Sequence, residues 1–164
     1  MNHNTKNLIG VLEDEISVLN KIKKVEDEKK ELLLQNKIVD LAPQNDRLNP
    51  LIKESATLEQ RREAILRELG IVYQNQRLTL RDLIYKISPS DEGEKLLSIR
   101  STLQQITQEI KELNEVNKIM INDLVKIMDY TLDGLADERK VEINYGDRNY
   151  VSKDYKSLVV NTVI

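Results

Sequence analysis

Hydrophobic residues recur at alternating steps of three and four along one stretch of the chain, residues 89–135. This is the a/d heptad pattern of a helix that packs against other helices along its length. At about 1.5 Å per residue, a helix over this stretch would be roughly 70 Å long. The positions of the pattern are Leu96, Ile99, Leu103, Ile106, Ile110, Leu113, Asn117, Met120, Leu124 and Ile127. The pattern predicts one long helix as the main element of the chain.

Two further patterns of helical period occupy the first half of the chain. The first predicts a helix over about residues 4–42 and the second a helix over about 47–69. Pro43 and Pro50 both disfavour a helical residue before them. We therefore expect a break or kink somewhere within residues 36–50.

Charged residues interrupt the first pattern at 26–31. Such blocks usually belong to solvent-exposed helix surface. The acidic cluster Glu13, Asp14 and Glu15 is interpreted in the same way, as a solvated surface opposite the apolar face. The alternative for the block at 26–31 is a docking patch. The acidic cluster is not expected to converge on a substrate.

A short helix is predicted over residues 78–87, with Thr79 suited to cap its first turn. The long helix then begins at residue 89. Ser88 is suited to its N-cap position and Pro89 to its first turn, and acidic residues follow.

The period of the pattern changes from 3.6 to 2 after the long helix. Val141, Ile143 and Tyr145 alternate with polar residues, and the end of the chain is rich in β-branched residues. A strand without a partner is marginal in water. We expect residues 1–137 to form one elongated helical domain and residues 138–164 a non-helical tail that is extended or mobile.

Together these elements predict an all-α fold. The expected architecture is an elongated antiparallel helical bundle, or coiled-coil-like hairpin, of about three long helices and one short helix. The chain has no Phe and no Trp. Leu and Ile must therefore fill the core, which suits narrow helix-helix contacts.

Composition argues against several classes of function. The net charge of -3 argues against nucleic-acid binding, which depends on a basic surface. No apolar run is long enough to insert into a membrane, and no signal-peptide segment follows the N-terminus, so we expect a cytoplasmic protein. With no cysteine, one histidine (His3) and isolated glycines, the sequence predicts no catalytic group, no cofactor and no metal site.

The remaining candidate function is protein binding by the long helix. Its half from Leu96 to Ile110 is expected to pack within the chain. Its half from Leu113 to Leu135 would be covered either by the chain itself or by the amphipathic helix of a client. Asn117 would fix the register internally or hydrogen-bond the client. The alternative is a structural or adaptor coiled-coil protein that forms a homodimer through the same pattern.

The sequence resembles the FlgN family of flagellar export chaperones over nearly its whole length. The segments that carry the resemblance are Leu32-Leu33-Leu34 followed by Asn36, Leu58-Glu59-Gln60-Arg61-Arg62, Leu80-Arg81-Asp82-Leu83-Ile84, Leu113-Asn114-Glu115-Val116-Asn117 with the apolar residues after it, and Tyr145-Gly146-Asp147. The chain departs from the family pattern at Pro43 and Pro50, and at Arg148-Asn149 after the Tyr-Gly pair.

This resemblance implies a cytoplasmic chaperone without enzymatic activity or cofactor. Its clients would be the hook-filament junction proteins of the FlgK and FlgL types, bound through their C-terminal helical segments. Binding would prevent early polymerisation and deliver the clients to the flagellar type III export gate. Tyr145 would contact the gate component of the FlhA type. The residues expected to bind the client are Leu113, Asn117, Met120, Leu124, Ile127, Met128 and Leu132.

Overall fold

The computed structural model describes residues 3–72, 78–88 and 90–140, with side chains described for 3–70, 78–88 and 90–135. This part of the chain contains helices and no strand, which confirms the predicted all-α fold. In chain order the elements are α1 (His3–Leu34), the 3-10 helix η1 (Ile38–Asp40), α2 (Leu41–Val72), α3 (Leu80–Ile87) and α4 (Asp91–Lys140).

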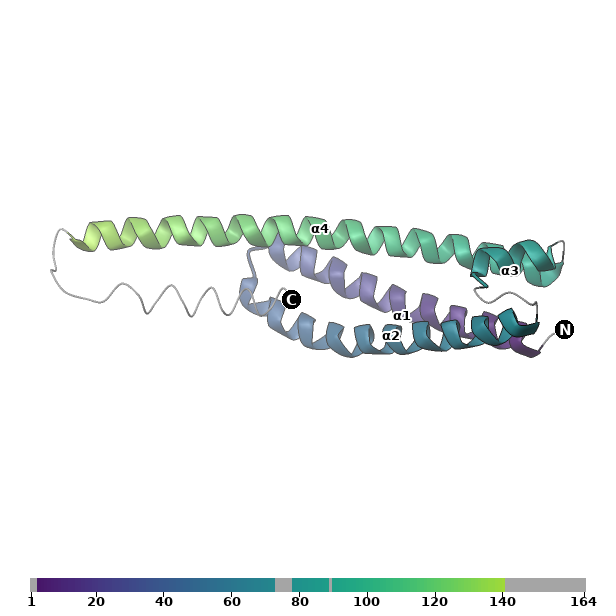
Figure 1. Ribbon diagram of the computed structural model, residues 1–164. Helices are drawn as coiled ribbons and strands as arrows, with labels where there is room; N and C mark the ends of the chain where they lie inside the picture. The colour runs from purple at the N-terminus through teal and green to yellow at the C-terminus, as the bar shows by residue number, and fades with distance from the viewer. Residues whose placement is uncertain (1–2, 73–77, 89, 141–164) are drawn as a thin grey trace.

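Helix α1 lies between α2 and α4 and packs against both (Figure 1). Helices α1 and α2 are antiparallel, as expected for a hairpin. Two ion pairs between them show this direction: Glu15 near the start of α1 pairs with Arg62, and Glu28 near its end pairs with Arg47.

Helix α4 runs parallel to α1 rather than antiparallel to it. Glu13 pairs with Lys95 and Lys23 pairs with Glu109, so both helices progress in the same direction. The chain turns back along α2 to the end at which α1 begins, and α3 and the start of α4 lie at that end (Figure 1). The predicted antiparallel arrangement therefore applies to α1 with α2, and α4 adds a parallel neighbour.

Helix α1 ends at Leu34, several residues before the end that the sequence pattern predicts. The next turn is a left-handed cap, because Asn36 has a φ of 56°. The N–H groups of Asn36 and Lys37 donate to the carbonyls of Leu33 and Leu32 at 3.0 and 2.9 Å. Asparagine is one of the few residues that adopt this conformation readily, so it ends the helix here.

Both prolines lie within α2 instead of between two helices. Pro43 is in the first turn, where the backbone N–H has no partner in the helix and its loss costs little. Pro50 lies further inside the helix. The break expected within residues 36–50 therefore lies at the start of that range.

Helix α3 has the predicted cap. The hydroxyl of Thr79 accepts from the N–H of Asp82 at 3.2 Å, and the Asp82 carboxylate accepts from the N–H of Thr79 at 3.1 Å. Helix α4 begins two residues later than predicted, and its first turn is capped by a different serine: Ser90 Oγ accepts from the N–H of Gly93 at 3.1 Å.

The larger part of the core lies at the end of the molecule where α3 is. Its buried residues are Leu8, Ile9, Leu12, Leu69, Leu78, Leu83, Ile84, Leu96 and Ile99. A smaller cluster between α1 and α2 contains Val18, Ile22 and Leu58. The hydrophobic core is therefore strongest at one end of the molecule.

Candidate functional site

Helix α4 extends beyond the helix on which it packs (Figure 1). Asn117 of α4 lies beside Glu26 of α1, to which it is hydrogen-bonded. Helix α1 continues for eight residues after Glu26, whereas α4 continues for 23 residues after Asn117. At 1.5 Å per residue, about 20 Å of α4 has no α1 residue beside it.

The apolar stripe that α4 buries against α1 continues past the end of α1. Leu113, Met120 and Leu124 lie alongside α1 and are half-buried, and so is Met128, just past its end. Leu132, further along the same face, is 40% exposed. The pattern of the helix thus continues after the cover provided by the neighbouring helices ends.

A second group of apolar side chains stands on the flank of α4. Its members are exposed and share one side of the helix by their spacing: Val116, Ile119, Ile127 and Tyr130. Together, the two groups make much of the circumference of α4 apolar over this length. We use the term distal α4 surface for Met120, Leu124, Ile127, Met128, Leu132 and Leu135. Three of these residues, Ile127, Leu132 and Leu135, are exposed, and the other three are half-buried. Exposed apolar residues grouped in this way are typical of protein-binding sites.

Asn117 belongs to the interior of the protein and not to the distal α4 surface. It is 2% exposed. Its amide nitrogen donates to the backbone carbonyl and to the Oε2 of Glu26, at 2.9 Å in each case. The structure therefore places it in internal contact with α1, the first of the two roles that its heptad position suggested.

Glu26 is the centre of a buried polar cluster between α1 and α4. It is 1% exposed, and its Oε1 accepts from Lys29 Nζ at 3.1 Å. With its amide nitrogen turned toward Glu26, Asn114 also donates to Oε2 at 3.1 Å. The Asn pair of the family-like segment thus provides two of the donors for one buried carboxylate, in addition to Lys29.

The interpretation of residues 26–31 as a solvated block is wrong for two of its members. Glu26 and Lys29 are buried, because α1 is the central helix and has a helix on two sides. A buried carboxylate is tolerated when a cation and several donors pair with it. Because α1 lies between two helices, Glu15 is buried as well, and its carboxylate pairs with Arg62 at 2.6 Å. Only Glu13 and Asp14 of that acidic cluster are exposed.

Burial raises the pKa of Glu15, and its ion pair with Arg62 opposes that shift only in part. One carboxylate oxygen of Glu15, Oε1, is buried and accepts no hydrogen bond in the described part of the chain. Desolvation therefore outweighs the attraction of the guanidinium at this contact.

The sequence contains a pattern that predicts the burial of these polar residues, and the interpretation of charged residues as exposed surface overlooks it. Helix α1 has its own unbroken pattern of alternating steps of four and three, in which three positions are charged: Leu8, Leu12, Glu15, Leu19, Ile22, Glu26, Lys29 and Leu33. Counting charged residues as members of the pattern would have predicted their burial.

The other predicted features are only partly covered by the structure. Tyr145 and most of the tail 138–164 lie outside the described residues, while residues 138–140 belong to α4. No helix of the described residues is long and apolar enough to cross a membrane. In the same ranges, no three His, Cys, Asp or Glu side chains are grouped as a metal site would require.

Comparison with known proteins gives one match. The model of the family described as FlgN protein matches residues 1–150 of this chain. No curated protein and no solved structure matches the chain significantly.

Proposed function

Because the chain belongs to the FlgN family of flagellar export chaperones, we propose that it is a cytoplasmic chaperone for the hook-filament junction proteins of the FlgK and FlgL types. It binds their C-terminal helical segments, prevents premature polymerisation and delivers them to the type III export gate. The observation that carries this proposal is the distal α4 surface, in which Ile127, Leu132 and Leu135 are exposed apolar side chains past the end of α1.

An amphipathic client helix fits such a surface. Its apolar residues at i, i+3, i+4 and i+7 would lie along α4, next to Leu124, Met128 and Leu132. Each buried Leu or Met contributes about 1.5–3 kcal/mol. Because a disordered client segment pays the cost of ordering when it binds, the net affinity is moderate, which suits release at the gate.

The proposal also assigns Tyr145 to the export gate, as the residue that contacts a component of the FlhA type. This residue follows α4 in the chain, after the distal α4 surface. A gate contact there would bring the bound client close to its point of delivery. Tyr145→Ala should reduce export and leave client binding intact; normal export by this variant would contradict the assignment.

The sharpest test of client binding uses Ile127 and Leu132, two residues of the distal α4 surface that are exposed enough to be substituted without disturbing the fold. Ile127 is 59% exposed and Leu132 is 40% exposed. The double variant Ile127→Asp, Leu132→Asp should keep its helical circular dichroism and lose co-purification with junction-protein C-terminal segments.

A matched control places the same charge change on the opposite face of α4. Asn122→Asp with Lys126→Gln also makes two exposed side chains more negative by one charge each, and this variant should bind clients like the wild type. Client binding that persists in the Ile127→Asp, Leu132→Asp variant would contradict the proposal. A dimer that this variant converts to monomers, with no client affinity in the wild type, would instead favour the homodimer.

A further inference from the structure

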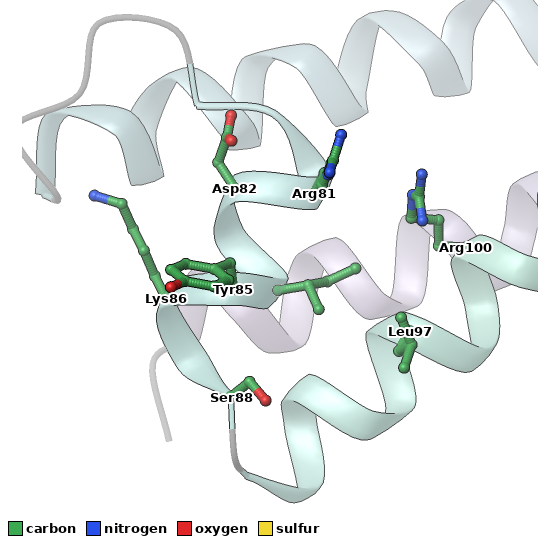
Figure 2. Close-up of a pocket in the computed structure, with 8 residues that line it drawn as sticks. Arg81, Asp82, Tyr85, Lys86, Ser88, Leu97 and Arg100 are labelled. Atoms are coloured by element: carbon green, nitrogen blue, oxygen red, sulfur yellow. The ribbon is translucent and has the colours of Figure 1, made fainter.

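A pocket opens between α3 and the start of α4, at the end of the molecule opposite the distal α4 surface (Figures 1 and 2). Its volume is about 550 Å³. We use the term α3–α4 pocket for the site formed by Arg81, Asp82, Tyr85 and Lys86 of α3 with Leu97 and Arg100 of α4. The sequence assigned no binding role to these residues, although Arg81 and Asp82 lie in one of the segments that carry the family resemblance, and the proposed client surface does not include them.

The apolar side chains of this pocket are unusually exposed. Tyr85 is 87% exposed and Leu97 is 54% exposed, although their neighbours Leu83 and Leu96 are fully buried in the core. Helix α3 therefore holds its position through one face and presents Tyr85 on another. Exposed Tyr beside Arg is a combination that is enriched among the residues contributing most to protein-protein affinity.

The pocket is positively charged, although the chain as a whole has a net charge of -3. It contains three basic side chains and one carboxylate, Asp82. That carboxylate is already engaged, since it accepts from the N–H and the hydroxyl of Thr79, which lower its pKa. With its lowered pKa Asp82 stays ionised and offsets one of the three positive charges, so the pocket keeps a net positive charge.

Two of the basic groups form no ion pair with a described residue, although Arg81 is close enough to Asp82 to help lower its pKa. Arg47 and Arg62 form ion pairs with α1, whereas Arg81 and Arg100 form none with any residue that the structure describes. Figure 2 shows these two side chains on the same side of the pocket, one from each helix. Each of these guanidinium groups can pair with a carboxylate of a bound segment, in the bidentate geometry that Arg favours.

We propose that the α3–α4 pocket binds an acidic peptide segment of a protein partner. An apolar side chain of that segment packs on Tyr85 and Leu97, and its carboxylates pair with Arg81 and Arg100. The charge of the pocket selects an acidic occupant, and the apolar floor selects a peptide with a hydrophobic residue beside its acidic ones.

This site would work independently of client binding. Leu97 and Leu132 are on one continuous helix, and 35 residues at 1.5 Å each separate them by about 50 Å. A partner in the α3–α4 pocket and a helix on the distal α4 surface would not overlap. The inference therefore stands or falls separately from the proposed chaperone function.

The test uses a set of fluorescein-labelled peptides of twelve residues, each with three Glu and one Leu or Tyr at varied spacing. Fluorescence anisotropy with the full chain should show that at least one peptide binds, and that added salt weakens the binding. The peptide with every Glu replaced by Gln should bind at least about tenfold more weakly.

Charge reversal on the protein gives the corresponding test. Arg81→Glu with Arg100→Glu should weaken binding about tenfold or more, and Tyr85→Ala should weaken it without a change in net charge. The control is Lys21→Glu with Lys53→Glu, which makes the same charge change at exposed positions on α1 and α2. Circular dichroism checks that each variant folds. If the charge-reversal variant does not fold, Arg81→Gln with Arg100→Gln is used in its place.

Two results of these measurements would overturn the proposal. One is that the wild type binds none of the peptides, whether or not it binds phosphatidylserine vesicles, and the other is equal binding by the wild type and the folded Arg81, Arg100 variant. Equal losses in the control variant would also overturn it, because the effect would then come from net charge and not from the pocket.

Discussion

Asn117 of α4 donates to both the backbone carbonyl and the carboxylate of Glu26 on α1, at 2.9 Å in each case. The two residues are 91 positions apart in the chain and both are buried. This contact fixes the register of α4 along α1. The register in turn determines how far α4 extends past the other helices, and so how much of its apolar stripe is exposed.

Removing the amide at this contact should destabilise the protein. Asn117→Ala leaves the Glu26 carboxylate buried with fewer donors, at a cost of about 1–3 kcal/mol in the free energy of unfolding. Urea denaturation followed by circular dichroism would measure it. The control Asn122→Ala alters an exposed Asn of the same helix and should change the value by less than about 0.5 kcal/mol. Equal effects of the two substitutions would show that the contact contributes little.

Replacing the whole polar cluster should have a different result from replacing one partner. In the triple variant Glu26→Leu, Lys29→Met, Asn117→Leu, neither the buried carboxylate nor the buried cation that pairs with it remains to be satisfied, and apolar side chains fill the contact. Stability should recover to within about 1 kcal/mol of the wild type or exceed it. If the triple variant is as unstable as Asn117→Ala, packing and not hydrogen bonding limits this site.

The hydrophobic pattern was sufficient to predict the helices but not the polar contacts between them. The stripe from Leu96 to Ile127 predicted α4, because a heptad pattern without internal proline has few other solutions. The end of α1 was missed because it depends on the left-handed conformation of Asn36 rather than on periodicity. The burial of Glu26 was missed because hydrophobicity alone leaves charged residues out of the α1 pattern, although Glu26 occupies one of its regular positions.

The distal α4 surface and the α3–α4 pocket also differ in how far the sequence predicts them. Ile127 and Leu132 could be selected from the sequence, since they continue an apolar pattern. The α3–α4 pocket could not, because Arg81 and Arg100 become neighbours only through the packing of α3 on α4. A sequence pattern identifies a helix face, whereas a site between two helices requires their relative placement.

Glu15 should make the stability of the protein depend on pH in a specific direction. Because burial raises its pKa in the folded state, the folded state favours the protonated form. Its contribution is thus most favourable below the unfolded-state pKa, and that advantage is lost as pH rises through the folded-state pKa.

The measurement is the difference in unfolding free energy between the wild type and Glu15→Gln, from urea denaturation at pH values from 4 to 7. Relative to the variant, the wild type should gain stability as pH falls. Carboxylates with lowered pKa, such as Glu28 and Glu109, oppose this trend but are present in both proteins and cancel. A wild type that loses stability relative to Glu15→Gln as pH falls would contradict the prediction.

Loss of the cap of α3 should lower the stability of the whole protein, although α3 is a short helix. Thr79→Ala removes the hydroxyl that accepts from the N–H of Asp82, and loss of such a cap costs about 1 kcal/mol. Thermal unfolding should shift to lower temperature in this variant, while Thr79→Ser should behave like the wild type. An unchanged unfolding temperature in Thr79→Ala would show that packing on the core alone holds α3.

Two substitutions on the same stripe of α4 should differ in their effect on stability, because one position is covered and the other is not. Leu113 is half-buried, whereas Leu132 lies past the end of α1 and is 40% exposed. Leu113→Asp should lower the free energy of unfolding by about 2 kcal/mol or more, since it places a charge against a packed apolar contact. Leu132→Asp should lower it by less than about 0.5 kcal/mol. Urea denaturation at several protein concentrations measures both, and a concentration-dependent loss in Leu132→Asp would mean that a second copy of the chain covers this end of α4.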